Sequence, residues 1–373
     1  MYKRQLQTRP DRRHAIEPTV SIVVGAYNEA ERIEGRIENL LALDYPADRV
    51  EIVVGSDGST DSTVERARRY ERFGVTVHAF ETRRGKPAVL NALAPTVNGE
   101  IVLFADARQR FERGTLRAIV ANFADPEVGA VSGELVLKPA EGAATAGHGA
   151  AFYWRYEKFI RSAESRADST VGATGAIYAV RRALFEPIPD DTLLDDMLVP
   201  LRIVRRGYRV LFEPAARAYD CTSATAGQEF ARKARTIAGN FQLLSRERWL
   251  FNPLQNRLWF ETISHKALRL TLPLLHAALL IANVAAAGAS PYQWLLAGQV
   301  AFYAGAIAGG VQRRGGRRFV GFTVPYMACL LSWATLVGFY RFLTNGQPVT
   351  WERAPVIAPA TEGAPQRAPG IAA

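Results

Sequence analysis

Cysteine is nearly absent from this chain of 373 residues. The two cysteines, Cys221 and Cys329, lie far apart and match no metal-ligand or redox spacing. Their positions exclude a disulfide scaffold and a zinc module, and they fit a reducing compartment. The segment from Met1 to Thr19 is basic and has no apolar core, so it does not predict a secretory signal.

Charged residues are absent from two long stretches near the C-terminus. Residues 270–311 contain no Asp, Glu, Lys or Arg over 42 positions, and residues 319–340 contain none over 22 positions. About 20 apolar residues cross the hydrocarbon core of a bilayer. The first stretch therefore predicts a helical hairpin that turns near Ser290-Pro291, and the second predicts a third transmembrane helix. The alternative is a set of buried helices in a large globular domain, but such helices need polar positions on their solvent-facing side.

Basic residues flank these stretches on one side of the predicted membrane. Lys and Arg in short loops face the cytoplasm, so the sequence predicts a multi-pass protein of the cytoplasmic (inner) membrane with its N-terminal part in the cytoplasm. An odd number of spans then predicts that the tail after Arg341 is exported. The basic residues are Arg257, Lys266 and Arg269 before the first span, and Arg313, Arg314, Arg317 and Arg318 between the second and third.

Two common nucleotide-binding fingerprints are also missing, since no GxGxxG follows the first apolar run and no GxxxxGK[ST] occurs. Four apolar runs are nevertheless each followed by a helical pattern, which predicts an α/β fold with a mostly parallel sheet and helices on both faces. In such sheets ligands bind at the carboxyl ends of the strands. The four runs are residues 20–25, 50–55, 75–80 and 101–105.

Polar residues gather at these four strand ends. Tyr27-Asn28-Glu29 follows the first run. Asp57 follows the second run and can accept hydrogen bonds from a base or a ribose, although the neighbouring segment 59–61 can equally cap the next helix. The basic turn 83–86 offers cations and amides to a phosphate, or is a solvated turn. Asp106, after the fourth run, can hold a divalent cation between phosphates.

Two further charged clusters lie downstream. Asp190, Asp191, Asp195 and Asp196 precede a predicted helix, where acids suit the helix dipole. Alternatively, one of them is a general base whose pKa is raised by its acidic neighbour. The basic segment 232–235 is either a membrane-facing patch or a counter-charge for a leaving diphosphate.

Seven motifs, taken in this order, resemble the family 2 inverting glycosyltransferases, in particular the membrane-bound group related to cellulose, hyaluronan and poly-N-acetylglucosamine synthases. The resemblance covers the chain from about Val20 to about Leu343. The motifs are Ala26-Tyr27-Asn28-Glu29, Ser56-Asp57-Gly58-Ser59, Gly85-Lys86, Asp106-Ala107-Arg108, Gly172 to Ala176, Asp195-Asp196 and Arg232 to Arg235.

The resemblance implies a nucleotide-diphospho-sugar transferase fold. It also implies that Asp57 contacts the nucleoside, Lys86 the diphosphate and Asp106 a divalent cation (Mg²⁺ or Mn²⁺), while Asp196 is the base for the acceptor hydroxyl. Two departures matter. The second carboxylate of the family's metal motif is replaced by Arg108, and the Gln-any-any-Arg-Trp motif of the processive synthases is replaced by the segment 232–236.

We therefore expect a membrane-anchored inverting glycosyltransferase that acts on a glycan or lipid-linked glycan in polysaccharide biosynthesis. Transfer to polyprenyl phosphate and a non-catalytic nucleotide-sugar-binding protein are the alternatives. The expected partners are the nucleotide-sugar donor, the acceptor, the membrane and subunits of a polysaccharide export system, with no nucleic acid. The expected site residues are Asp196, Asp195 and Arg235 for catalysis, Tyr27, Asn28, Glu29, Asp57, Lys86, Asp106 and Arg232 for donor binding, and Asp106 for the metal.

The sequence also predicts how the chain is divided. Leu250, Leu254 and Leu258 recur at helical spacing beside aromatic residues, which predicts either a helix in the headgroup region or an ordinary core helix. The expected divisions are a basic arm (1–18), a cytoplasmic glycosyltransferase domain (19–246), an interfacial amphipathic segment (247–266), three transmembrane helices (267–343) and a flexible tail (344–373).

Overall fold

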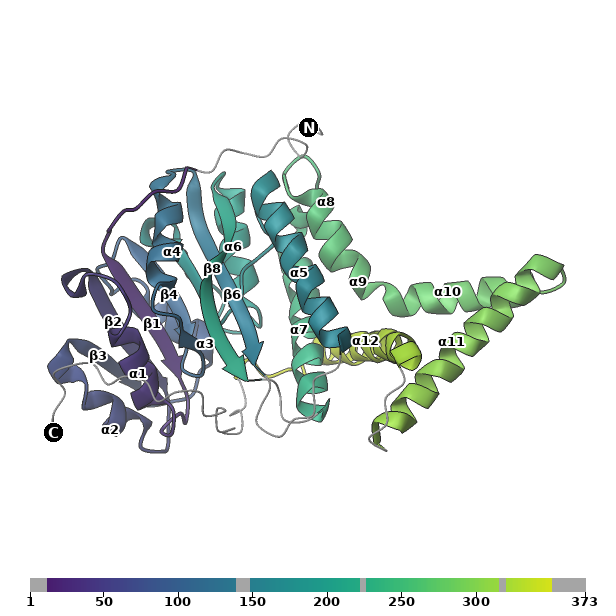
Figure 1. Ribbon diagram of the computed structural model, residues 1–373, viewed down its shortest axis with the longest axis horizontal. Coiled ribbons are helices and arrows are strands. Elements are labelled where there is room, and N and C mark those ends of the chain that lie inside the picture. The colour runs from purple at the N-terminus through teal and green to yellow at the C-terminus, as the bar shows by residue number, and fades with distance from the viewer. Residues whose placement is uncertain (1–11, 139–147, 222–225, 315–319, 351–373) are drawn as a thin grey trace. The chain divides into compact units, whose positions relative to one another are not determined.

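The computed structural model describes residues 12–138, 148–221, 226–314 and 320–350 (Figure 1). These residues fall into two compact units. The first contains residues 12–138, 155–221 and 348–350, and the second contains residues 148–154, 226–314 and 320–347. Most of the predicted flexible tail, residues 351–373, lies outside the described residues.

The first unit is built on one eight-stranded sheet with the strand order β3-β2-β1-β4-β7-β6-β8-β5 (Figure 1). The four predicted strands form its parallel half, β3-β2-β1-β4. The other half is mixed, because β7 runs antiparallel to both β4 and β6, while β6 and β8 are parallel. The strands are β1 Val20–Ala26, β2 Val50–Asp57, β3 Val75–Phe80, β4 Ile101–Asp106, β5 Arg110–Phe111, β6 Val128–Lys138, β7 Ile177–Arg181 and β8 Arg209–Cys221.

Helices and short helical turns connect these strands. The predicted helices after the first four strands are present as α1 to α4. The helices of the first unit are α1 Ile33–Leu41, α2 Thr63–Arg68, α3 Lys86–Leu93, α4 Thr115–Ala121 and α6 Asp195–Arg205, with α5 His148–Ala167 beginning in the second unit and ending in the first. The helical turns are η2 Ala47–Arg49, η3 Glu71–Phe73, η4 Asn122–Ala124 and η5 Arg182–Leu184.

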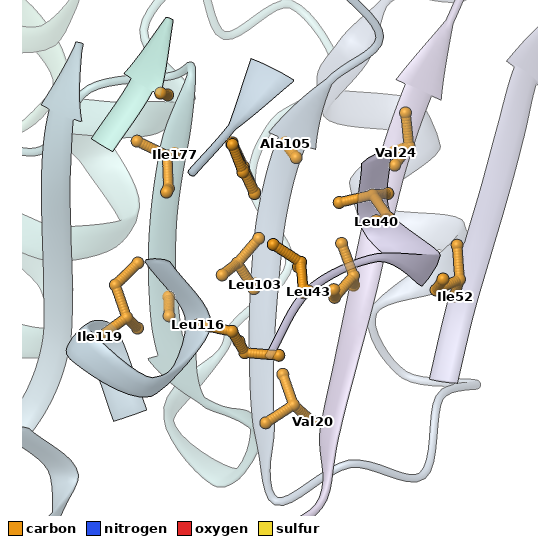
Figure 2. Packing of buried hydrophobic residues seen from close by; sticks show 14 of the residues in the cluster. Val20, Val24, Leu40, Leu43, Ile52, Leu103, Ala105, Leu116, Ile119 and Ile177 are labelled. Carbon is orange, nitrogen blue, oxygen red and sulfur yellow. The ribbon is translucent and has the colours of Figure 1, made fainter. Parts of the chain in front are cut away.

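Apolar side chains cover both faces of the parallel half, as the continuous apolar runs predict. On one face, Leu40 of α1 and Leu116 of α4 pack with Val24 and Leu103 of the strands (Figure 2). On the other face a Cβ at Gly55 would meet Leu93 and Val89 of α3 at 2.6 Å, so α3 lies directly against the sheet. This double cover leaves the strand ends as the place for polar side chains.

The second unit is helical and contains the apolar stretches. Two of its helices are long and apolar enough to cross a membrane, and a third span is added if the bent pair 259–270 and 272–285, which meet at 65°, counts as one. The predicted turn near Ser290-Pro291 is confirmed, because one helix ends at Ala285 and the next begins at Ser290. The elements are α7 Ala226–Arg246, η6 Arg248–Phe251, α8 Trp259–Thr262, η7 Ile263–Ala267, α9 Leu268–Leu270, α10 Leu272–Ala285, α11 Ser290–Arg314 and α12 Val320–Leu343.

The predicted helix through Leu250, Leu254 and Leu258 is wrong. The chain forms a short helical turn and then a loop, in which the side chain of fully buried Asn256 donates to the carbonyl of Leu250 and accepts from the amide of Leu258. Pro253 lies within this loop, lacks an amide hydrogen and cannot continue a helix. Leu250, Leu254 and Leu258 therefore do not lie on one helix, despite their spacing.

The end of the described chain returns to the first unit. A Cβ at Gly85 would lie 2.6 Å from Cγ1 of Val349, so this residue packs directly on the turn before α3. The contact places Val349 on the same side of any membrane as the sheet. The expected export of the tail after Arg341 is therefore wrong for this part of the chain.

Candidate active site

The ends of β1 and β2 are joined by hydrogen bonds between the turns that follow them. Asn28 adopts a left-handed conformation with φ 52°. Its side-chain oxygen accepts from the amide of Thr60 at 2.8 Å, and its own amide donates to Oγ of Ser59 at 3.1 Å. Glu29 is buried, and its carboxylate accepts from Arg32 at 2.7 Å. Asn28 and Glu29 thus hold the rim of the strand ends in place.

Asp57 is buried at the end of β2 and supports the turn before α3. Its two carboxylate oxygens accept from the amides of Arg84 at 2.7 Å and Gly85 at 2.8 Å. The predicted offer of these amides to a phosphate is therefore wrong, because they are engaged by Asp57. Its contact with a nucleoside stays a prediction.

The cations of this turn point in different directions. The guanidinium of Arg83 lies over the ring of Tyr27 at 3.7 Å. Arg84 pairs with exposed Asp190 at 3.1 Å. Lys86, at the first residue of α3, points inward instead. Of the three cations, only Lys86 lies among the acids of the site.

Lys86 connects the two halves of the sheet. Its Nζ lies 2.8 Å from Asp106 at the end of β4, donates to the carbonyl of Gly175 at 3.0 Å, and lies 3.7 Å from Asp195 at the start of α6. Burial alone would lower the pKa of Lys86, but the attraction of Asp106 and Asp195 raises it above its ordinary value. The amine is therefore a fixed positive charge.

Asp106 is the acidic partner in this pair. Burial would raise the pKa of Asp106, yet Lys86 and Arg108 together lower it below its ordinary value. Arg108, which occupies the position of the second metal carboxylate, turns to Asp220 of β8 at 2.9 Å. Asp106 is thus ionised, and one third of its side chain is exposed. Arg108 forms an ion pair with Asp220 instead of with Asp106.

Asp196 stands at the start of α6, and its pKa is raised. Its Oδ2 accepts from the amide of Gly175 at 2.7 Å. Burial and the charge of Asp195 raise the pKa of Asp196 to about 6, against the opposing effect of Lys86. The predicted like-charge effect of the acidic neighbour is confirmed, with burial as the larger cause.

A tyrosine of the neighbouring strand β7 holds the side chain of Asp195. Asp195 is buried and accepts from the hydroxyl of Tyr178 on β7 at 3.1 Å. Gly175 lies so close to the site that a Cβ there would meet Oδ2 of Asp196 at 3.2 Å and Nζ of Lys86 at 3.5 Å. Sequence reasoning noted Gly175 within a motif but missed Tyr178, because a tyrosine in an apolar strand gives no local signal.

The structure brings together Lys86, Asp106, Asp195 and Asp196. Asp190 and Asp191 are exposed. Arg232 and Arg235 lie on α7 in the second unit, so the roles expected of them stay predictions.

The sequence of the chain is similar to those of known glycosyltransferases. The family model described as "Glycosyltransferase like family 2" matches residues 18–239. The poly-beta-1,6-N-acetyl-D-glucosamine synthase of Staphylococcus aureus (strain COL) is 26% identical over 238 residues, which are 61% of this chain and 56% of that protein. A probable glycosyltransferase of Bacillus subtilis, YdaM, is 25% identical over 236 residues, 60% of this chain and 55% of that protein. The chain thus spans little more than half the length of these relatives.

One solved structure is similar over most of the chain. It is the mannosyltransferase PcManGT from Pyrobaculum calidifontis, in complex with GDP-Man and Mn²⁺. It is 28% identical, the alignment covers 92% of each chain, and the TM-score is 0.69. The similarity extends beyond the residues that match the family model.

Proposed function

Because the chain belongs to glycosyltransferase family 2, we propose that it is a membrane-anchored inverting glycosyltransferase. It moves a sugar from a nucleotide-diphosphate donor to a glycan or lipid-linked glycan at the cytoplasmic face of the membrane. One observation carries this proposal: Lys86 and Asp106 lie directly beside Asp195 and Asp196 at the carboxyl ends of the strands. The first pair suits a charged donor, and the second pair suits an acceptor that loses a proton.

The reaction follows from these positions. The fixed charge of Lys86 stabilises the negative charge that develops on the leaving diphosphate. Asp196 accepts the proton of the acceptor hydroxyl as its oxygen attacks the anomeric carbon from the face opposite the diphosphate. Asp195, oriented by Tyr178, keeps the pKa of Asp196 raised, so that Asp196 is a stronger base than an ordinary carboxylate. Fixing both substrates in line supplies much of the remaining acceleration.

The donor set at Asp106 fits a divalent cation that is held mainly by the substrate. Asp106 offers one partly exposed carboxylate, and no group of three or more His, Cys, Asp or Glu side chains that could hold an ion occurs in the described part of the chain. Mg²⁺ typically takes one or two carboxylates and completes its shell with phosphates and waters. When bound, such a cation supplies positive charge to the diphosphate.

Membrane anchoring is the second part of the proposal. The two long apolar helices and the bent helix pair support it. A cysteine introduced at Ser290, in a Cys221→Ser, Cys329→Ser background, should react with an impermeant maleimide on intact cells, and one at Gly315 should not. Because Val349 contacts Gly85, an even number of crossings is expected, so these labelling results would mean that the bent pair and α11 cross the membrane and that α12 does not cross it. Labelling at Gly315 alone would refute the orientation.

The test of the enzyme is direct. Purified full-length protein in nanodiscs, given a panel of labelled nucleotide sugars with Mg²⁺ or Mn²⁺, should release nucleoside diphosphate from one of them. Asp196→Asn should bind that donor and fail to turn it over, while Asp190→Asn, which alters an exposed acid, should behave as the wild type. If the wild type turns over no donor in the presence of membrane lipid extract, the proposed activity is wrong.

A further inference from the structure

A second cation near Asp106 has no role in the proposed mechanism. Arg108 lies in the segment between β4 and β5, and 32% of its side chain is exposed. Its Nε donates to Oδ2 of Asp220 at 2.9 Å, whereas its two Nη atoms form no hydrogen bond or ion pair with the residues that the structure describes. Neither Nη atom is buried without a partner, so both are open to solvent and can contact a ligand.

Asp220 holds the guanidinium of Arg108 at Nε. The carboxylate of Asp220, near the end of β8, is 5% exposed, and it also accepts from Nε2 of Gln109 at 3.0 Å and from the amide of Cys221 at 2.8 Å. These fixed donors leave the carboxylate little freedom to move. Because it binds Arg108 through Nε, the edge of the guanidinium that carries both Nη atoms stays available, and this edge matches two oxygens of a phosphate.

The charge of Arg108 acts on the candidate active site as well as on Asp220. Burial would raise the pKa of Asp106, and the charges of Lys86 and then of Arg108 are the largest effects that lower it. In the same way, burial would lower the pKa of Arg108, and the charges of Asp220, Asp106 and Glu29 raise it. Arg108 therefore lies near the ends of β4 and β1, where Asp106 and Glu29 stand.

Lys86 has fewer donors left for a ligand than Arg108 has. Its Nζ already binds Asp106 at 2.8 Å and the carbonyl of Gly175 at 3.0 Å, and its side chain is only 12% exposed. Lys86 therefore contributes to the site mainly as a charge. Arg108, by contrast, combines a positive charge with N–H donors that no described residue uses, and such donors can contact phosphate oxygens directly.

We propose that Arg108 binds the diphosphate of the nucleotide-sugar donor through its two Nη atoms, while Asp220 holds its Nε. The inference rests on the proposed function and adds a binding residue to its donor side. As the acceptor oxygen bonds to the anomeric carbon, Asp196 takes the proton of that hydroxyl, and the bond from the carbon to the diphosphate breaks. Its electron pair leaves with the diphosphate, whose added negative charge Arg108 stabilises. This contact does not require a divalent cation.

Binding of nucleoside diphosphates tests this contact without turnover. The affinities of UDP, GDP, ADP, CDP and dTDP are measured by calorimetry on the full-length protein in nanodiscs, in EDTA and again in Mn²⁺. One of them should bind measurably even in EDTA. Arg108→Gln should weaken its binding in EDTA about tenfold, the size of a charge-assisted contact, and should leave the affinity for the parent nucleoside unchanged. Arg110→Gln is the matched control, because Arg110 is exposed and donates to the carbonyl of Gly35.

A second variant separates binding from folding. Arg108→Gln leaves Asp220 buried without its cation, and such an unpaired charge is destabilising. The thermal unfolding midpoint should therefore fall in Arg108→Gln and largely recover in the double variant Arg108→Gln, Asp220→Asn. The affinity of the double variant for the diphosphate should stay about tenfold below that of the wild type. If the affinity recovers together with the midpoint, Arg108 supports only the fold and the proposal is wrong.

The remaining outcomes distinguish the Arg108 contact from the proposed function. Three results would overturn the contact and leave the glycosyltransferase activity standing: equal affinities of Arg108→Gln and Arg110→Gln, an equal loss for the nucleoside and the diphosphate, or binding by the wild type in Mn²⁺ alone. If the loss is specific to the diphosphate but no nucleotide sugar is turned over, the contact holds and the activity is refuted. If no nucleoside diphosphate binds even in Mn²⁺, both are refuted.

Discussion

The two halves of the sheet contribute to the site in different ways. In the parallel half, β1, β2 and β4 end side by side, and each site residue stands at or just after the end of its own strand. In the mixed half, Asp195 and Asp196 stand at the start of α6, where the turn before β7 binds Asp196 and Tyr178 of β7 binds Asp195. Lys86 joins the halves through Asp106, Gly175 and Asp195. On the proposed function, the side assigned to the donor is fixed by strand ends, and the side assigned to the acceptor is fixed by contacts with β7 and the turn before it.

This contrast predicts the largest effect on the acceptor side. Asp196→Asn keeps the hydrogen bond from Gly175 but cannot accept a proton, so turnover should fall by roughly 10² or more. Donor affinity, measured by calorimetry, should stay within a few-fold because the donor side is untouched. Turnover that survives within a few-fold would show that Asp196 is not the base.

A smaller effect, on binding rather than turnover, is expected on the donor side. Asp106→Asn removes the acid that pairs with Lys86 and leaves one candidate metal ligand uncharged. Donor affinity in the presence of Mn²⁺ should fall by about tenfold, the size of one charge-assisted contact. Asp190→Asn is the matched control, because its acid pairs with Arg84 at the surface. An unchanged dependence of donor affinity on Mn²⁺ in Asp106→Asn would exclude the metal role.

The two halves also differ in how far the sequence predicted them. The strands and helices of the parallel half were predicted because each strand, its turn and its helix are consecutive in the chain. The positions of Asp57 and Asp106 at the strand ends, and of Lys86 at the start of α3, followed from the same local order. The engagement of Asp57 by two backbone amides was not predicted, because it depends on a turn 27 residues away.

In the mixed half, the partners of the site residues could not be predicted from local sequence patterns. Tyr178 supports Asp195 from an apolar strand, and Asp220 of β8 neutralises Arg108 over 112 positions of sequence. Neither partner can be identified from spacing, since register between distant strands is set by tertiary packing. The missing helix around Leu254 has a different cause: Pro253 and the buried Asn256 outweigh the leucine spacing.

The pH dependence of the reaction should report on the acceptor side alone. Since the pKa of Asp196 is raised to about 6, kcat/KM should drop as pH falls through 6, approaching a tenfold loss for each further pH unit. Asp195→Asn removes the like charge that contributes to this raised value, so the midpoint should move to lower pH. A midpoint that does not move would show that the charge of Asp195 does not raise the pKa of Asp196.

The same raised pKa has a consequence for stability with the opposite sign. The folded protein holds a proton on Asp196 more tightly than the unfolded chain, so this residue favours the folded state at acidic pH, and the contribution is lost as pH rises from about 4 to about 6. Asp196→Asn should remove this part of the pH dependence of the thermal unfolding midpoint.

A stability measurement tests the contact between the turn before α3 and the end of the described chain. Gly85 has φ 98° and ψ 161°, a conformation that is nearly restricted to glycine, and its added Cβ would also meet Val349. Gly74 has φ 81° and nothing within 4 Å of an added Cβ. Gly74→Ala should therefore cost about 1 kcal/mol of stability, and Gly85→Ala about 2–3 kcal/mol.

A double-mutant cycle separates the two causes at Gly85. Val349→Ala shortens the side chain that the new methyl group meets, so the double variant Gly85→Ala, Val349→Ala should be more stable than the sum of the single effects by about 0.5–1 kcal/mol. The backbone strain should persist, because it is independent of Val349. The measurement is the free energy of urea unfolding of the full-length protein in detergent, followed by a probe in the first unit. If the single effects simply add, Val349 does not pack on Gly85, and the evidence that the end of α12 lies on the catalytic side of the membrane is lost.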